Sequence, residues 1–225
     1  MGRSSSHETN RIVTALQFRG SSCYFVDRFF GGSKIDPRNN TKSHEGSPCT
    51  GQLSDTTRRM QELNSLATVD AEAEFLKCCG SRNWARSLTE ARPFTDADAL
   101  FQIADSVWRS LSDEDWLEAF RAHPKIGEQK AAAVQSEQAR SWSAQEQSGI
   151  QDAVTETKAA LAAGNQEYEE RFGFIFIVCA TGKNSEEMLA ILNARLQNDR
   201  ETELRLAAEE QRKITRLRLE KLLKQ

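Results

Sequence analysis

The heptapeptide Ala122-His123-Pro124-Lys125-Ile126-Gly127-Glu128 contains the only histidine after residue 44. Ser112 and Asp115 lie ahead of it with the spacing of an N-terminal capping pair, which predicts a helix that leads into the heptapeptide. Pro124 ends that helix, because the residue before a proline is disfavoured in the α-helical region. We therefore expect His123 at the C-terminal edge of the helix, with its ring directed off the end.

His123 has two interpretations on this evidence. The partly negative C-terminal end of a helix favours a protonated imidazole, and histidine titrates closest to neutral pH, so a proton donor is one role. A histidine that only caps the helix before a turn is the other. This one stretch leaves both open.

Helical patterns extend in both directions from the heptapeptide. We predict helices from Thr68 to Cys79-Gly80, from Asn83 to Ala91, after a capping box of Thr95 with Asp98, from Ser143 to about Ala163 with Gly164-Asn165 as its end, from Glu186 to Gln197 and from Glu201 to about Lys224. Residues 130–140 are rich in Ala and Gln and form either a helix or a long ordered loop. No repeat and no strand-helix-strand alternation occurs. The predicted fold class is all-α, with a single compact multi-helix domain over residues 59–225.

Residues 1–58 differ in composition from this domain. They are rich in Ser, Gly, Asn, Thr and Arg and carry eight basic and five acidic side chains, a net charge of +3. Such a segment is typical of a disordered extension. A transit peptide and a start codon assigned too far upstream are two explanations for it.

Composition excludes several classes of protein. The 225 residues are 38% hydrophobic, enough for one core, and the net charge of -3 argues against a nucleic-acid-binding surface. No apolar stretch approaches the roughly 18 residues of a membrane span. The cysteines, which are Cys23, Cys49, Cys78, Cys79 and Cys179, form no C-x-x-C pair and are odd in number. They indicate reduced thiols in a cytoplasmic protein and neither a disulfide framework nor a metal site.

The segment Trp142-Ser143-Ala144-Gln145-Glu146-Gln147 has the form of a second capping box, with Ser143 as the cap and Glu146 as its partner. A cap does not require Gln147. Glu146 and Gln147 on a first helical turn, beside free backbone N–H groups, form a polar cluster that can bind a small molecule with carbonyl and amide edges. A structural cap and a ligand contact both stay open here.

Arg218 falls on the apolar face of the last predicted helix. That stripe consists of Leu204, Ala208, Gln211, Ile214, Arg218 and Leu222. Arg216 lies with Arg212 on the opposite, solvent-facing side. A guanidinium on a buried stripe is costly unless it is paired, so Arg218 makes either an internal ion pair or an anchor for an anionic or amide-rich ligand.

The run Phe172-Gly173-Phe174-Ile175-Phe176-Ile177-Val178-Cys179-Ala180 is the most apolar part of the chain. Its branched and aromatic residues favour an extended segment, yet no partner strand is evident. An extended backbone without a sheet leaves N–H and C=O groups to satisfy, and a polar ligand is one candidate for that role.

Taken together, these segments resemble one enzyme family, the 2-oxo-4-hydroxy-4-carboxy-5-ureidoimidazoline (OHCU) decarboxylases of urate catabolism. The motifs that carry the resemblance are His123-Pro124-x-Ile126-Gly127, Trp142-Ser143-x-x-Glu146-Gln147-x-Gly149, Tyr168-x-x-Arg171-Phe172-Gly173-Phe174-x-Phe176-Ile177, Cys179-Ala180-Thr181-Gly182-Lys183 and Lys213-Ile214-x-x-Leu217-Arg218-Leu219. Each motif alone is weakly specific, but five in order and spacing are strongly so. The resemblance runs from about Leu63 to the end, and residues 1–58 have no counterpart in it.

The resemblance implies a cofactor-free, all-helical enzyme, usually a homodimer, that decarboxylates the small-molecule intermediate preceding (S)-allantoin. His123 matches the family's proton donor and Glu146 its catalytic carboxylate. The positions that match substrate contacts are Pro124, Ser143, Gln147, Phe176, Ile177, Val178, Cys179, Ala180 and Arg218. Ile175 stands where some members have proline, a departure within the binding segment.

A helical interaction module is the rival interpretation, in which His123, Glu146 and Arg218 only cap helices and pair charges. A helix-turn-helix nucleic-acid binder is a more distant one, and the acidic balance argues against it. The interpretations differ in where the three side chains lie: separate surface sites favour a module, and one cleft favours an enzyme.

Overall fold

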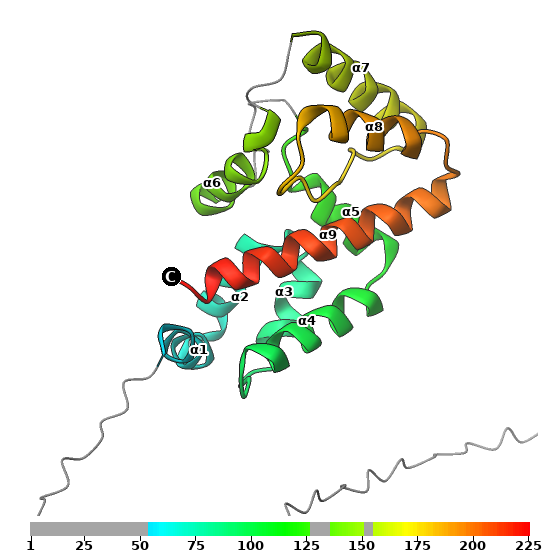
Figure 1. Ribbon diagram of the computed structural model, residues 1–225. Coiled ribbons are helices and arrows are strands. Elements are labelled where there is room, and N and C mark those ends of the chain that lie inside the picture. Colours follow the sequence, from blue (N-terminus) through cyan, green and yellow to red (C-terminus); the bar gives the residue numbers. More distant parts are fainter. Residues whose placement is uncertain (1–53, 127–135, 151–154) are drawn as a thin grey trace, which may run out of the picture. The chain divides into compact units, whose positions relative to one another are not determined.

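A computed structural model describes residues 54–126, 136–150 and 155–225 (Figure 1). Over these ranges the chain forms nine α-helices and one 3-10 helix and contains no strand. The elements are α1 Asp55–Ser65, α2 Thr68–Cys78, α3 Arg82–Glu90, α4 Ala97–Ser110, α5 Asp113–Arg121, α6 Glu137–Glu146, η1 Ser148–Ile150, α7 Thr155–Phe172, α8 Ser185–Arg195 and α9 Arg200–Leu222. The all-α prediction is confirmed. The predicted extension lies outside the described residues up to position 53.

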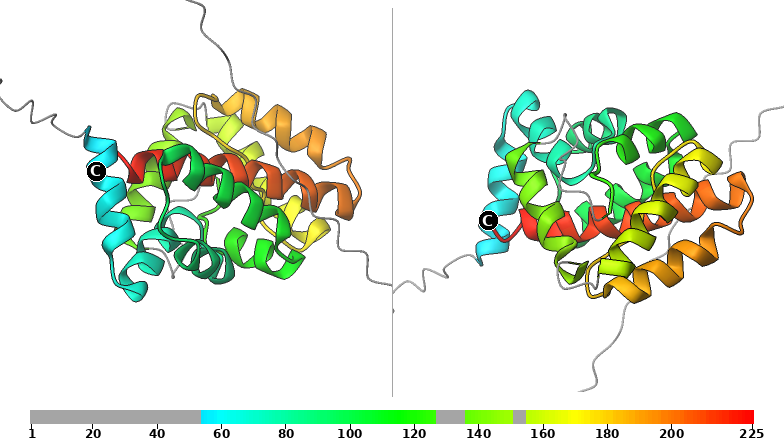
Figure 2. Two further views of the ribbon diagram at one scale, coloured as in Figure 1. Left: turned by 90° about the horizontal axis from the view of Figure 1, so that it is seen from below. Right: turned by 90° about the horizontal axis from the view of Figure 1, so that it is seen from above.

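Helix α9 is the element against which most others pack (Figures 1 and 2). It contacts α2, α4, α5 and α7. In Figure 1, α1 to α4 lie below it, and α7 and α8, which pack on each other, lie above it. Buried positions run along α9 from Glu203 to Leu222, so this one helix supplies core surface to both groups.

Two buried tryptophans fix the group below α9. The Trp84 Nε1–H donates to the Ala104 carbonyl at 3.1 Å, and the Trp108 Nε1–H donates to the Ala208 carbonyl at 2.9 Å. A buried indole N–H needs such an acceptor, because an unpaired polar group in the core is costly. The second bond ties α4 directly to α9.

The helix ahead of the His123 stretch matches its prediction. Ser112 and Asp115 form the complete capping box of α5, with bonds in both directions. The helix ends at Arg121, and the His123 N–H donates to the Phe120 carbonyl at 3.0 Å in a tighter closing turn. His123 therefore lies just past the helix end, as expected from Pro124.

The predicted helix from Ser143 to Ala163 is wrong. Ser143 lies inside α6, which Ser136 caps by accepting the Ala139 N–H at 3.2 Å. Glu146 is the last residue of α6 and Gln147 its C-terminal cap, so neither occupies a first turn. The capping-box interpretation of Ser143 with Glu146 is therefore wrong as well.

Gly164-Asn165 does not end a helix, because α7 continues through it to Phe172. A Cβ at Gly164 would lie 2.7 Å from Leu192 Cδ2 of α8. The glycine therefore permits close packing of α7 on α8, and the helix tolerates its weak propensity at this point.

The cap of α4 differs from the predicted one. Asp96, not Thr95, caps α4, since its carboxylate accepts the Ala99 N–H at 2.8 Å. Helix α2 begins at Thr68 but has no side-chain cap. Helix α1 begins at Asp55, so the proposed boundary between residues 58 and 59 falls inside a helix. The alternatives for residues 130–140 lie partly outside the described residues, and the part from Glu137 is helical.

Candidate active site

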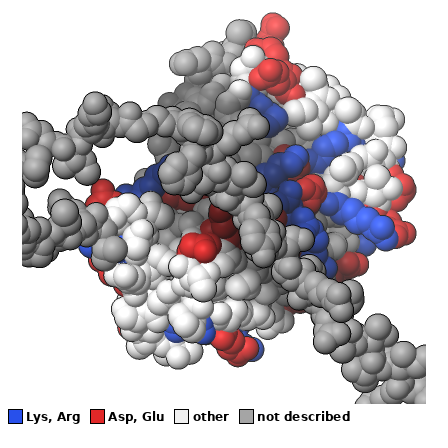
Figure 3. All heavy atoms as spheres, turned by 60° about the horizontal axis from the view of Figure 1, so that its bottom comes forward, with Lys and Arg blue, Asp and Glu red and all other residues white. Residues whose placement is uncertain are grey.

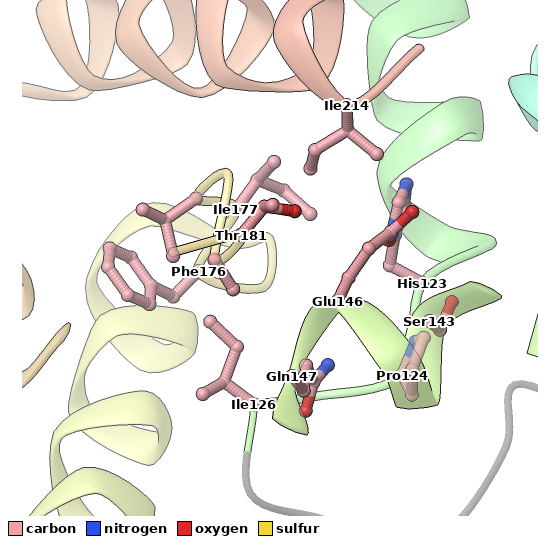
Figure 4. A pocket seen from close by; sticks show the side chains of 12 residues that line it. His123, Pro124, Ile126, Ser143, Glu146, Gln147, Phe176, Ile177, Thr181 and Ile214 are labelled. Atoms are coloured by element: carbon pink, nitrogen blue, oxygen red, sulfur yellow. The ribbon is translucent and has the colours of Figure 1, made fainter. Parts of the chain in front are cut away.

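A single hollow collects most of the residues that the sequence marked (Figure 4). The space between its walls amounts to about 400 Å³, open solvent included. Its lining comes from the end of α5, the end of α6, the segment after α7, and α9. The lining residues are His123, Pro124, Ile126, Ser143, Glu146, Gln147, Phe176, Ile177, Val178, Ala180, Thr181 and Ile214.

His123 carries a neutral imidazole in this setting. Burial and, next, the charge of Arg218 lower its pKa to about 3, while a hydrogen bond with Gln211 raises it. The position at a helix end favours a protonated ring, and burial acts in the opposite direction. Desolvation disfavours the charged form more strongly than a helix terminus favours it.

Glu146 is held by a two-pronged ion pair from α9. Arg218 Nε donates to Glu146 Oε1 at 3.1 Å and Arg218 Nη2 donates to Glu146 Oε2 at 2.8 Å. Nη2 also donates to the Ser143 hydroxyl at 2.9 Å, and Lys221 Nζ lies 3.5 Å from Glu146 Oε1. This bidentate geometry fixes the carboxylate in place beside His123 (Figure 4).

The segment from Phe174 to Ala180 has no regular secondary structure, and two positive-φ glycines flank it, Gly173 at 80° and Gly182 at 79°. Only glycine adopts such angles without strain, so both positions allow the chain to turn sharply into and out of the segment. The predicted extended, sheet-free backbone is consistent with this path.

Protein groups bond to the backbone on both sides of Val178, and beyond them the Ala180 carbonyl accepts the Lys183 N–H at 3.0 Å. The Ile177 carbonyl accepts from Arg195 Nη1 at 2.6 Å, the Cys179 N–H donates to Glu210 Oε2 at 2.8 Å, and the Cys179 carbonyl accepts from Lys183 Nζ at 2.7 Å. Within the described ranges, no hydrogen bond engages the Val178 N–H or C=O. In an extended chain, alternate residues point their polar groups to opposite sides. Val178 therefore offers a donor and an acceptor on the side of the segment opposite these protein contacts.

A second ionic cluster fixes the far side of the segment. Arg195 Nε donates to Glu203 Oε1 at 2.6 Å, and the Tyr168 hydroxyl bonds to the same carboxylate. Asn198 Nδ2 donates to Glu203 Oε2 at 2.7 Å. Because Arg195 also binds the Ile177 carbonyl, the cluster sets the position of the backbone that lines the hollow.

Two predicted substrate contacts do not line the hollow. Arg218 lies behind Glu146 with 3% of its surface exposed, and Cys179 has its backbone turned toward Glu210. Three lining residues were missed as contacts, namely Ile126, Thr181 and Ile214. All three stand within the quoted motifs, so proximity to the marked positions was the available indication.

No group of three or more metal-ligating side chains occurs in the part of the chain that the structure describes. The buried thiols are poor ligands as they stand, since burial raises the pKa of Cys79 to about 11 and raises that of Cys78 further. Likewise, no helix of the described ranges is long and apolar enough to cross a membrane.

Basic and acidic side chains intermingle on the face shown in Figure 3. Arg212, for example, pairs with Asp105 at 2.8 Å and with Glu209. This mixture of signs is consistent with the net charge of -3.

Residues 64–220 match the sequence profile of the OHCU decarboxylase family. The chain belongs to this family. Among solved structures, it is similar to an OHCU decarboxylase crystallised in the presence of (S)-allantoin, with a TM-score of 0.59 and 36% identity over 68% of this chain and 98% of that one. The predicted resemblance is confirmed.

Two curated relatives place the family match in context. The uric acid degradation bifunctional protein TTL of Arabidopsis thaliana is 38% identical over 157 residues, covering 70% of this chain and 48% of that protein. The OHCU decarboxylase of Amia calva is 32% identical over 169 residues, covering 73% and 94%. The chain thus spans about half the length of the bifunctional relative from Arabidopsis thaliana.

Proposed function

We propose that this protein decarboxylates 2-oxo-4-hydroxy-4-carboxy-5-ureidoimidazoline to (S)-allantoin in urate degradation, without a cofactor. The observation that carries the proposal is that His123, Glu146 and the 176–180 segment, distant in sequence, line one hollow in a chain of this family. A helical interaction module would not need them to converge. The convergence therefore favours an enzyme over the rival interpretation.

The reaction suits a site that positions the substrate and delivers one proton to carbon. When the bond to the carboxylate breaks, CO2 leaves and its electron pair spreads into the imine and carbonyl groups next to the ring carbon. The anionic carboxylate departs as a neutral molecule, so one proton is taken up overall. The residues must orient the substrate, receive the hydroxyl proton and deliver a proton to carbon, while the former imine nitrogen takes up the further proton from solvent.

Glu146 is the group that engages the substrate hydroxyl. The fork from Arg218 holds its carboxylate rigidly, so it acts from a fixed position. Arg218 in this scheme contributes by orienting Glu146 and supplying positive charge near an anionic substrate, and it contacts substrate directly only if it leaves Ser143. The free Val178 N–H and C=O complement the amide edges of the ureido group.

His123 delivers the proton to one face of the carbanion, which yields a single enantiomer. Its pKa of about 3 in the empty site means that it is neutral at pH 7. The substrate carboxylate brings a negative charge into the same hollow, and a nearby negative charge raises the pKa of an imidazole. Substrate binding thereby favours the protonated form of His123, which can donate.

A circular-dichroism assay tests the proposal. Urate is oxidised by urate oxidase and the product is hydrolysed by hydroxyisourate hydrolase, with this protein, without it, or with heat-denatured protein. We expect rapid growth of the (S)-allantoin signal only with the native protein. Identical traces in all three reactions would contradict the proposed activity.

Three finer statements are also proposals. We propose a homodimer, testable by light scattering, and a cytoplasmic location, testable by fractionation. We also propose that the N-terminal residues are dispensable. A chain that starts at Ser54 keeps α1 whole with its cap, and it should retain full turnover and melting temperature.

A further inference from the structure

Gln211 is a buried polar residue that does not itself line the hollow. It lies on α9 with no exposed surface, two turns before Arg218 on the same face. Its Nε2 donates to the Thr215 hydroxyl at 3.2 Å. Its Oε1 is buried, and no described residue donates a hydrogen bond of normal geometry to it. Buried acceptors are nearly always satisfied, so this one requires an explanation.

The group beside this acceptor is the His123 imidazole. Hydrogen bonding with Gln211 raises the pKa of His123, in opposition to burial and to the charge of Arg218. A partner that raises the pKa of an imidazole is one that accepts its N–H. The two side chains are thus close enough to interact.

Thr215 determines which end of the Gln211 amide faces the ring. The Thr215 hydroxyl lies beside the Cys79 thiol. Burial raises the pKa of this thiol, and a hydrogen bond from Thr215 lowers it. Thr215 therefore gives its proton toward the sulfur and accepts the Gln211 Nε2–H with a lone pair. This order of donors leaves Gln211 Oε1 for His123.

We propose that Gln211 is a positioning residue that holds His123 in one tautomer, with the ring N–H on the α9 side donated to Gln211 Oε1 and the other nitrogen turned to the hollow. The consequence for catalysis rests on the proposed function, but the tautomer is a property of the empty protein. The charged group that acts on the ring from α9 is Arg218, and Glu146 of α6 lines the same hollow.

Nitrogen-15 spectroscopy of the full-length protein tests the tautomer directly. The His123 signals are assigned by their loss in His123→Asn, which separates them from His7 and His44. At pH 7 we expect one pure neutral tautomer in the wild type and a mixture in Gln211→Leu. Thr215→Val, a milder change, should shift the ratio in the same direction. An unchanged pure tautomer in the variants that fold would overturn the proposal.

Steady-state kinetics add a second readout. Gln211→Leu should lower kcat about tenfold, roughly the size of one hydrogen bond, and move the basic limb of the kcat profile to lower pH, because His123 must be protonated to donate. Gln211→Glu places a carboxylate at the same position and should move that limb to higher pH. Gln166→Leu, which removes an exposed amide on α7, is the matched control and should change neither.

The kinetic outcomes are distinguishable from failure of the proposed activity. Identical basic limbs for the wild type, Gln211→Leu and Gln211→Glu would overturn the positioning role. A protein without decarboxylase activity that still shows the Gln211-dependent tautomer would contradict the proposed function and leave the positioning role intact.

Discussion

The described part of the chain contains two buried arginine–glutamate pairs, and their surroundings differ. Arg195 with Glu203 is enclosed by Tyr168 and Asn198, and every bond of the cluster ends on protein. Arg218 with Glu146 is equally buried on the arginine side, at 3% exposure, but its carboxylate lines the hollow beside His123. The same two residue types thus form one closed cluster and one open to a ligand.

This difference in surroundings distinguishes structural from functional ion pairs. Breaking a buried pair leaves an uncompensated charge, so a closed cluster should show its importance in stability. A pair that faces a cavity should show it in turnover, because its carboxylate remains available to a substrate. Four comparisons of variants test this division.

The largest effect should come from opening the closed cluster. Glu203→Leu leaves Arg195 buried without its carboxylate and should cost about 3 to 5 kcal/mol of unfolding free energy. Glu201→Gln, in an exposed pair with Arg205, is the control and should cost less than about 1 kcal/mol. Urea unfolding measures both, and equal costs would contradict the description of the cluster as a buried structural element.

Glu146→Gln should act chiefly on turnover. The amide keeps the shape of the side chain and can still accept from Arg218, but it cannot receive a proton or carry charge. We expect kcat to fall about a hundredfold or more, with a smaller loss of stability than in Glu203→Leu. Full activity in this variant would mean that the carboxylate only pairs with Arg218.

Sequence patterns predicted the fold class and the collection of site residues, but not how Glu146 is held. The Ser112 cap and Pro124 fixed the position of His123 through local rules alone. The Ser143 box failed because Ser136, seven residues earlier, offers an equally good cap, and local spacing cannot choose between two starts. Sequence patterns could not identify the partner of Arg218, because Glu146 lies 72 residues away. Only tertiary packing brings the two side chains together.

The next effect contrasts two arginines on α9. Arg218→Ala releases Glu146 and Ser143 together and should weaken kcat/KM by about 1.5 to 3 kcal/mol, the range for charged hydrogen bonds. Arg216 pairs with Glu220 and lies 3.5 Å over the Phe101 ring, away from the hollow. Arg216→Ala should leave kcat/KM unchanged and lower stability slightly. Equal kinetic effects would contradict the assignment of the two faces.

A smaller effect concerns pH and stability. The folded-state pKa of His123, about 3, lies below the unfolded value of 6.5. Between these values the unfolded chain binds a proton that the folded chain refuses, so this residue destabilises the fold as pH falls below about 6.5. His123→Asn should therefore lose less unfolding free energy than the wild type between pH 7 and pH 4. Parallel pH curves would show that His123 titrates normally.

The most direct test of the account is the circular-dichroism assay of His123→Asn beside the wild type. Asparagine keeps a polar side chain of similar reach but cannot supply an acidic proton. We predict that the variant still binds allantoin, while its production of (S)-allantoin falls to the rate measured without protein. In free solution both faces of the planar intermediate are open, so any product should lose its enantiomeric excess. A fully active His123→Asn that still makes only (S)-allantoin would contradict the central claim.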